Sequence, residues 1–262
     1  MSQVPEMDFE DTPGARLRMA LATIRTDVDE AFDQWLPVPD DTRAPLVEAM
    51  RHAAIGGGKR VRPLLLVATA GMFNVSREAA VLAGTAVEAI HVYSLIHDDL
   101  PCMDDDDIRR GKPTVHKAFD EATAVLAGDA LHVLAFDILT DAGVSSDPFI
   151  QAELVRCLAK ASGMSGMAGG QAMDMAADSA TYDLHTITRL QQLKTGALLT
   201  ASVEMGAILG RVPPESRAPL LNYARDIGLA FQIVDDLLDA GATEMARRIR
   251  GREVSAAEVV DA

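Results

Sequence analysis

The 262-residue sequence contains little cysteine, few aromatic residues and too few basic residues to balance its acidic ones. Cys102 and Cys157 are its only cysteines, which are too few for the disulfide framework of a small secreted domain. The formal net charge of -15 argues against nucleic acid and anionic membrane surfaces as partners, because long-range repulsion opposes both. The chain also lacks an uninterrupted apolar run of roughly eighteen residues, the length that marks a membrane-spanning helix. No charged and apolar leader opens the sequence, so we expect a cytoplasmic protein without a membrane span.

Helical periodicity is what the sequence has in abundance. Hydrophobic residues make up 48% of the chain and aromatic residues 4%, which favours an aliphatic, helix-rich interior in one domain. Long segments rich in Ala and Leu, bounded by Gly, Pro, Asp or Ser, predict helices over residues 78–100, 121–142, 149–168, 186–209 and 214–239. Strand alternation is almost absent. We expect an all-α helical bundle with an elongated cavity between facing helices, preceded by a flexible arm of residues 1–14.

An acidic cluster in the first half of the chain is the most informative motif. Six carboxylates lie within ten residues and are followed at once by Arg109 and Arg110; they belong to Asp98, Asp99 and Asp104–Asp107. Carboxylates this dense repel one another unless a hard cation neutralises them, and oxygen ligands suit Mg2+, with Mn2+ as the alternative. Paired arginines beside such a cation are typical of a diphosphate site. The other interpretation is a solvated acidic loop.

A second acidic cluster ends a long apolar segment near the end of the chain: Asp235, Asp236 and Asp239. The first and last of these are four residues apart and would share one face of a helix. In the first cluster, Pro101 predicts that the helix bends or ends, which lets Asp104 fold back toward Asp98. The two clusters would then face each other across a metal ion. We predict as metal ligands Asp98, Asp99, Asp104, Asp235 and Asp239.

A glycine-rich basic segment precedes the first acidic cluster. Residues 56–62 combine a flexible backbone with three cations. Lys59 and Arg62 are three residues apart, a spacing that corresponds to one face of a helical turn. The segment suits a second anion, and the alternative is a flexible basic linker. It is not a Walker A loop, since that motif needs its lysine to be followed directly by Ser or Thr.

Two histidines, His91 and His97, lie in an apolar segment. A histidine there is more often a packed core residue than a ligand, and hard Mg2+ does not favour imidazole. We predict that His97 either packs in the core or supports a ligand of the site without binding the metal itself.

Five segments together resemble motifs of the trans-isoprenyl diphosphate synthases, in the order of that family: residues 57–63, 91–113, 169–174, 194–197 and 231–236. The similarity covers about residues 15–240, and the bacterial farnesyl diphosphate synthases are the group that the sequence resembles most. It implies a helical bundle with both acidic clusters at the mouth of the cavity, and a homodimer. The implied reaction condenses isopentenyl diphosphate with an allylic diphosphate, dimethylallyl or geranyl, to farnesyl diphosphate and releases diphosphate.

The resemblance also implies roles for individual residues. Isopentenyl diphosphate would be bound without metal by Lys59, Arg62, His91 and Arg110. The allylic diphosphate would contact Arg109, Lys194, Thr195 and Gln232. Catalysis would depend on Asp98, Asp104, Arg109, Lys194 and Asp235, with Mg2+ as the cofactor. Tyr93 precedes Asp98 by five residues and would place its ring across the cavity floor, where chain growth stops at about fifteen carbons.

After Asp239 the sequence departs from the family's pattern, because the Gly-Lys loop that helps to bind the allylic diphosphate is missing. We therefore expect residues 15–240 to form a C-terminally truncated synthase domain and residues 241–262 not to match the family. Three functions stay open: an active prenyltransferase, an inactive or regulatory homologue that pairs with an active subunit, and a metal phosphohydrolase built on His97 and Asp98. The scattered histidines disfavour the phosphohydrolase.

Overall fold

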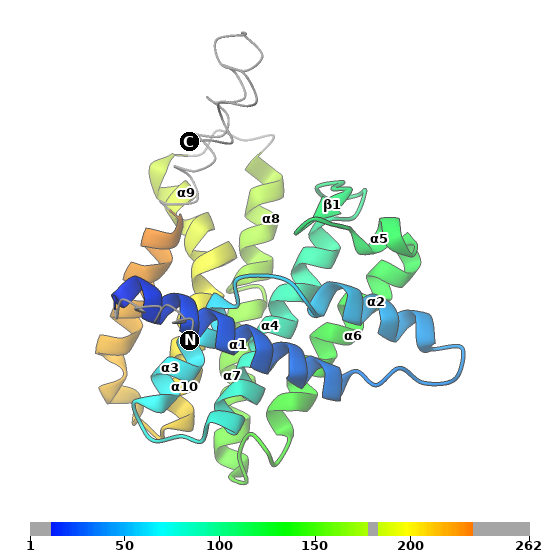
Figure 1. Ribbon diagram of the computed structural model, residues 1–262. Helices are drawn as coiled ribbons and strands as arrows, with labels where there is room; N and C mark the ends of the chain where they lie inside the picture. Colours follow the sequence, from blue (N-terminus) through cyan, green and yellow to red (C-terminus); the bar gives the residue numbers. More distant parts are fainter. Residues whose placement is uncertain (1–11, 178–182, 233–262) are drawn as a thin grey trace, which may run out of the picture.

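The computed structural model of the protein describes residues 12–177 and 183–232. Over these residues the chain is helical apart from connecting turns and one pair of two-residue strands. The all-α fold predicted from the sequence is therefore confirmed. Figure 1 shows the order of the helices.

Four helices form the first part of the chain. They are α1 (Pro13–Trp35), α2 (Ala44–Ala54), α3 (Val61–Gly71) and α4 (Arg77–Asp98). The Thr12 side chain accepts a hydrogen bond from the Ala15 amide, and Pro13 occupies the first helical position, so α1 has a clear start. Residues 13 and 14, which the sequence placed in a flexible arm, are thus helical. Ser76 caps α4 in the same way.

A short antiparallel hairpin follows α4. It consists of β1 (Ile108–Arg109) and β2 (Lys112–Pro113), and it leads into α5 (Val115–Ala118) and α6 (Glu121–Thr140). The hairpin is tied to the end of α2, because the Lys112 ammonium donates to the Ile55 carbonyl at 3.1 Å. The basic segment 56–62 and the arginine pair are thereby held next to each other.

The second part of the chain is also helical. Its elements are α7 (Pro148–Ser162), α8 (Met167–Ala177), α9 (Leu184–Gln191), the π-helical turn η1 (Gln192–Gly196), α10 (Ala197–Leu209) and the 3-10 turn η2 (Pro214–Ser216), followed by helical residues 218–232. The single helix predicted over residues 149–168 is wrong, since α7 ends at Ser162 and Gly163 adopts an extended backbone before α8 begins. The helix predicted from residue 214 begins only at residue 218.

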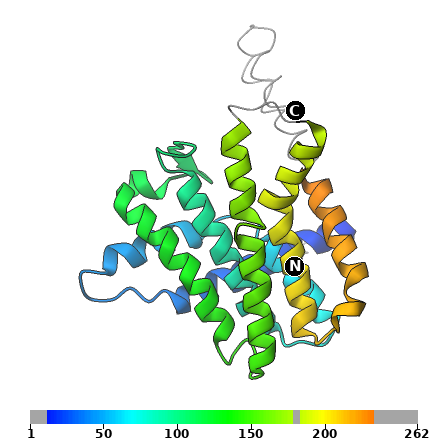
Figure 2. The ribbon, with the colours of Figure 1, turned by 180° about the vertical axis from the view of Figure 1, so that it is seen from behind.

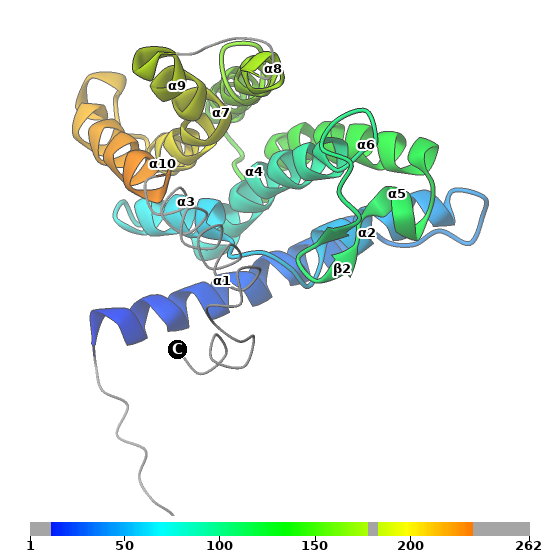
Figure 3. The ribbon, with the colours of Figure 1, turned by 90° about the horizontal axis from the view of Figure 1, so that it is seen from above.

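The apolar helix α4 forms the centre of the bundle. It packs against α3 and α6, while α10 covers α3 and contacts α7. Figure 3 shows α1 and α2 on one side of the row formed by α3, α4 and α6, with α8, α9 and α10 on the other side. Figure 2 shows from behind that α6 and α7, in green, lie side by side. Helix α4 therefore contacts helices from both halves of the chain.

Two helices, α4 and α6, are long and apolar enough to cross a membrane by length and composition. One or two such helices are weak evidence for a membrane span, because the core helix of a soluble protein passes the same test, and 72% of the apolar window in α4 is buried inside the bundle. In α6 the buried share is 39%, and Val125, Leu126 and Val133 are exposed.

Candidate active site

The first acidic cluster begins where α4 ends. Asp98 is the last residue of the helix, and residues 99–104 form turns around Pro101. The Asp104 amide donates a hydrogen bond of 2.8 Å to the Asp98 carbonyl. The chain therefore folds back as predicted and brings Asp104 next to Asp98.

A second part of the chain reaches Asp98 through Lys194. Burial raises the pKa of the Asp98 carboxyl from 3.8 to about 6; the charge of Lys194 opposes this rise and the charge of Asp104 adds to it. Lys194 lies in the π-helical turn η1, together with Thr195. Single π-helical turns occur mostly inside α-helices and often at functional sites, because they reorient a side chain within the helix.

Two contacts hold η1 in place. Lys194 forms an ion pair of 2.5 Å with Asp174 of α8. A side chain at Gly170 would put its Cβ 2.3 Å from the Lys194 amide nitrogen, so only glycine permits this close approach of α8 to η1. The glycine-rich motif of residues 169–174 thus positions Lys194.

Asp99 follows Asp98 directly and is 3% exposed. The Arg109 guanidinium donates from Nε to the Asp99 carboxylate at 2.8 Å and also from Nη2, and Nη2 reaches Asp106 at 2.8 Å. The predicted metal ligand Asp99 and the predicted diphosphate ligand Arg109 therefore hold each other. Arg109 lies between α4 and the acidic turn in a fixed orientation.

A cleft of about 720 Å3 opens beside the end of α4. We call it the cationic cleft, because its lining includes all four predicted ligands of isopentenyl diphosphate: Lys59, Arg62, His91 and Arg110. The helical spacing inferred for Lys59 and Arg62 is wrong, since α3 begins at Val61 and Lys59 precedes it. Lys59 instead lies over the Phe231 ring, with its Nζ 5.9 Å from the ring centroid.

The glycine-rich segment makes room for Arg110. A Cβ at Gly58 would lie 2.7 Å from the Arg110 guanidinium carbon, and Gly58 has a φ of +84°, which glycine adopts without strain. Arg110 itself has a φ of 54°. The backbone of residues 57–58 and the hairpin turn therefore place the guanidinium at the lip of the cleft.

The cleft concentrates positive charge. Burial lowers the pKa of His91 well below 6.5, and Arg62, Arg110, Arg60 and Arg109 add to this effect, so the imidazole is neutral near pH 7. Burial also lowers the pKa of Arg62, and repulsion from Arg110 adds to the decrease. Cations that disfavour one another's charge gain stability when a dianion enters between them.

Tyr93 lies between α4 and α6. Its ring stacks on His132 of α6 at a centroid distance of 4.6 Å and meets the edge of His97 at 5.8 Å. Burial raises the pKa of the Tyr93 hydroxyl, and the charge of Asp98 adds to the rise. His97 approaches the Val125 carbonyl at 3.1 Å through Nε2, which agrees with a packing role.

The residues present fit a hard cation only in part. Within residues 12–177 and 183–232 no group of three His, Cys, Asp or Glu side chains could enclose a metal ion. Asp98 and Asp104 supply oxygen ligands of the type that Mg2+ prefers, and the unfavourable pair of carboxylates would gain from a cation. The second acidic cluster, Asp235, Asp236 and Asp239, lies outside the described residues.

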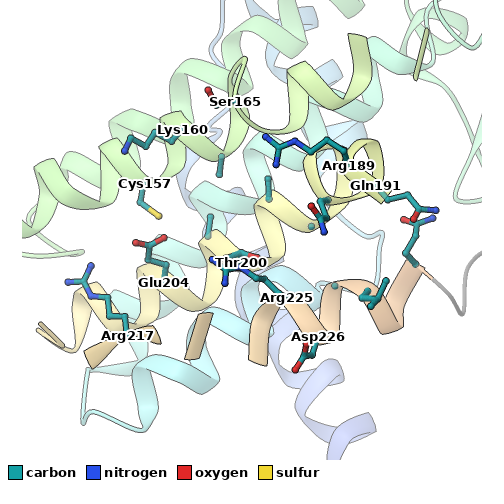
Figure 4. Close-up of a pocket in the computed structure, with 18 of the residues that line it drawn as sticks. Cys157, Lys160, Ser165, Arg189, Gln191, Thr200, Glu204, Arg217, Arg225 and Asp226 are labelled. Atoms are coloured by element: carbon teal, nitrogen blue, oxygen red, sulfur yellow. The ribbon is translucent and has the colours of Figure 1, made fainter. Parts of the chain in front are cut away.

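A second pocket of about 780 Å3 lies on the opposite face of α10 (Figure 4). It lies between α7 and residues 218–232 and contains none of the first acidic cluster. Glu153 pairs with Arg217 there at 2.6 Å, and Glu204 contacts Cys157. Gln232, a predicted ligand of the allylic diphosphate, lines this pocket and not the cationic cleft. We call it the outer groove.

Comparisons with known proteins identify the family of the chain. The sequence model of the family described as polyprenyl synthetase matches residues 43–249. The chain belongs to this family. The match includes the basic segment and both acidic clusters, and it runs past residue 240, where the sequence resemblance was expected to end.

Relatives in the polyprenyl synthetase family differ in their named products. The chain is 50% identical over 213 residues to the farnesyl diphosphate synthase of Escherichia coli (strain K12), which covers 80% of this chain and 71% of that protein. It is 44% identical to geranylgeranyl pyrophosphate synthase 4 of Arabidopsis thaliana, covering 81% of this chain and 57% of that protein. A crystal structure of an FPP/GFPP synthase from Zymomonas mobilis aligns with a TM-score of 0.84 and 62% identity, covering 86% and 82% of the two chains.

The roles implied by the resemblance do not cover every charged residue at the cleft. Arg60 and Glu88 also line it, and both are 1% exposed. Arg60 is one of the three cations of segment 56–62 but was given no role, and Glu88 was not predicted. A glutamate inside the otherwise apolar stretch of residues 79–90 was the available signal, because a buried carboxylate needs a partner.

Proposed function

We propose that this polyprenyl synthetase family member joins isopentenyl diphosphate to an allylic diphosphate and forms farnesyl diphosphate. The observation that carries the proposal is the cationic cleft beside Asp98, Asp104 and Lys194. A cluster of cations next to a pair of carboxylates suits two diphosphates, one bound directly and one bound through a metal. The relatives named as farnesyl diphosphate synthases support the same reaction.

The cationic cleft binds the diphosphate of isopentenyl diphosphate in this proposal. Arg62 and Arg110 supply charge, Lys59 closes the cleft from the side of Phe231, and the neutral His91 donates one N–H. No metal is needed there, because cations of the chain already line the cleft. Arg110 is the cation that the substrate reaches most directly, since it lies at the lip of the cleft.

The allylic diphosphate lies next to Lys194 and Thr195 in η1. Mg2+ is the proposed metal, in keeping with the metal dependence of farnesyl diphosphate synthases. Asp98 and Asp104 would hold it, together with Asp235 and Asp239 of the second acidic cluster. The metal would supply positive charge to the departing diphosphate. Asp99 has a different role in this proposal: it fixes Arg109, which then faces the same diphosphate.

The reaction needs electrostatic help and exclusion of water rather than a nucleophile of the protein. The allylic C–O bond breaks and its electron pair leaves with the diphosphate, which Lys194 and Arg109 stabilise as charge develops. The double bond of isopentenyl diphosphate then forms the new C–C bond to the allylic carbon. A proton leaves the adjacent carbon and restores a double bond, with the released diphosphate as its acceptor.

One assay of the purified protein tests this function. Labelled isopentenyl diphosphate is incubated with geranyl diphosphate and Mg2+, and dephosphorylated products are separated by chromatography. Farnesol is expected. Excess EDTA should abolish its formation and added Mg2+ should restore it. Release of diphosphate from geranyl diphosphate alone at the same rate would instead indicate the phosphohydrolase, and a folded protein that binds both substrates but forms no product would indicate the inactive homologue.

We also propose that the chain forms a homodimer in the cytoplasm. The exposed apolar side of α6 supports the dimer: Val125, Leu126 and Val133 are 42%, 56% and 68% exposed. A second copy that covers this side would bury them. Cys102 and Cys157 are both free thiols, as expected in a reducing compartment. Light scattering of the purified protein tests the dimer.

A further inference from the structure

Arg60 occupies an unusual position at the base of the cationic cleft. It is the residue before α3, it has a φ of 52°, and its side chain is fully buried. A buried arginine is rare unless it is paired, and a positive φ is unfavourable for a residue with a Cβ. Both costs are tolerated where the surrounding contacts determine the conformation.

Two carboxylates from different helices hold the Arg60 guanidinium. Nη1 donates to Glu88 of α4 at 2.8 Å, and Nη2 donates to Asp29 of α1 at 2.7 Å. Nη2 also donates to the Ala54 carbonyl at the end of α2. Arg60 therefore ties α1, α2 and α4 to the start of α3.

Asp29 clamps the other end of the same segment. Its second carboxylate oxygen accepts a hydrogen bond of 3.1 Å from the Gly56 amide. One carboxylate thus contacts both the first and the fifth residue of segment 56–60, and this fixes the segment that carries Lys59. Arg62 follows directly in α3.

Both terminal nitrogens of the Arg60 guanidinium are paired, only Nε has no hydrogen-bond partner among the described residues, and the side chain is fully buried, so Arg60 is not placed to bind the substrate directly. Glu88 also lies near the two arginines that face the cleft, because its charge raises the pKa of both Arg62 and Arg110 against the effect of burial. Glu88 therefore stabilises the charge of these two side chains, while Arg60 and Asp29 fix the backbone beneath them.

We propose that Asp29, Arg60 and Glu88 are positioning residues for isopentenyl diphosphate. They hold segment 56–60 so that Lys59 and Arg62 face the diphosphate, and they touch no substrate themselves. This inference rests on the proposed function of the cationic cleft. An ion-pair cluster with a purely structural role would stabilise the fold but would not affect the binding of one substrate more than the other. The two roles can therefore be separated by experiment.

The test compares Asp29→Ala with the control Asp27→Ala. Asp27 lies on the same helix, its side chain is 25% exposed against 22% for Asp29, and it also pairs with an arginine, Arg77. Only Asp29 contacts the glycine-rich segment. Calorimetry measures the dissociation constant of isopentenyl diphosphate without metal or allylic substrate, and steady-state assays measure the KM of geranyl diphosphate.

Asp29→Ala should raise the dissociation constant of isopentenyl diphosphate by about tenfold or more, which is a typical effect of losing a residue that orients a ligand-binding group. Asp27→Ala should leave the dissociation constant within about twofold of the wild type. Asp29→Asn keeps one acceptor oxygen and should fall between the two. The KM of geranyl diphosphate should change little in all three.

The inference would be overturned if Asp29→Ala bound isopentenyl diphosphate as tightly as the wild type does. It would also be overturned if Asp29→Ala and Asp27→Ala lost the same amount of affinity. Either result would leave the proposed function intact. If the wild type binds isopentenyl diphosphate but forms no product, the proposed reaction fails while a selective loss in Asp29→Ala still supports the positioning role. If the folded wild type does not bind isopentenyl diphosphate, both fail.

Discussion

The two pockets on either side of α10 have nearly the same volume, about 720 Å3 for the cationic cleft and 780 Å3 for the outer groove. Both linings carry more cations than carboxylates, but the excess differs: six cations and one carboxylate line the cleft, and five cations and three carboxylates line the outer groove. In the outer groove Arg217 is paired with Glu153. In the cleft the charge of Arg110 disfavours the charge of Arg62. The larger excess of positive charge, and not the volume, therefore distinguishes the cleft.

The same contrast appears within a single motif. Arg109 is paired with Asp99 and Asp106 and has its pKa raised by the hydrogen bond to Asp99. Arg110 lies against Gly58, and burial lowers its pKa. Two adjacent residues of the same type thus differ in what they offer to a substrate. Arg109 is held in place, and Arg110 is the better candidate for a direct contact.

The largest expected effect concerns the carboxylates beside the cleft. Asp98→Asn removes a charge at the meeting point of α4 and η1, and turnover should fall by at least about a hundredfold because the allylic diphosphate loses its metal-mediated hold. The matched control in the outer groove is Asp226→Asn, which should leave turnover near the wild-type value. Steady-state rates at saturating substrate measure both, and a similar loss in the two variants would abolish the contrast between the pockets.

A smaller effect is expected for the arginines. Arg110→Ala removes a charge-assisted hydrogen bond, worth about 1.5–3 kcal/mol, and should raise the KM of isopentenyl diphosphate by about tenfold or more. Arg225→Ala, in the outer groove, is the control and should not change it. If Arg110→Ala raises the KM of geranyl diphosphate to the same extent, the two diphosphates are not bound separately by the cleft and by η1 as proposed.

Tyr93→Ala tests the cavity rather than the charges. Loss of the ring that stacks on His132 should deepen the cavity, and the variant should form alcohols of about twenty carbons or more. If Tyr93 only packs between α4 and α6, the variant loses about 2–3 kcal/mol of stability and keeps the product of the wild type. Chromatography of dephosphorylated products decides this, with Tyr93→Phe as the control that retains the ring.

The smallest effect concerns stability. The folded-state pKa of Asp98, about 6, lies above its ordinary value of 3.8, so the folded protein binds this proton more tightly than the unfolded chain. The resulting stability is present below about pH 4 and is lost as the pH rises to about 6. Without metal, Asp98→Asn should therefore be more stable than the wild type at pH 7.5, by about 1–2 kcal/mol after solvent screening.

Urea unfolding at two pH values checks this prediction. At pH 4 the two proteins should have similar free energies of unfolding, and at pH 7.5 the variant should be the more stable. A variant that is less stable than the wild type at pH 7.5 would contradict the unfavourable burial of the Asp98 charge.

Local signals in the sequence predicted the parts of the site that depend on local geometry. Pro101 predicted the end of α4 and the return of Asp104, because a proline stops a helix through its own ring and missing amide. Gly163, in contrast, ends α7 within a segment whose periodicity continues, so one helix was predicted where two exist. The spacing of Lys59 and Arg62 was misleading, since the positive φ of Arg60 separates them.

Contacts between distant segments could not be predicted. Arg60 contacts Asp29 and Glu88 only after three helices have packed, and the sequence of segment 56–62 does not predict these partners. The pairing of Asp99 with Arg109 follows from the hairpin, which turns Arg109 back toward α4. Sequence patterns therefore gave the residue types of the site, and packing decided which of them face the substrate.

The most direct test of this account is a crystal structure of the protein soaked with isopentenyl diphosphate in the absence of metal. The diphosphate should lie in the cationic cleft, with its oxygens within hydrogen-bond distance of Arg62 and Arg110. The outer groove should stay free of it. Diphosphate density in the outer groove against Arg225, with none in the cleft at a concentration that saturates turnover, would contradict the account.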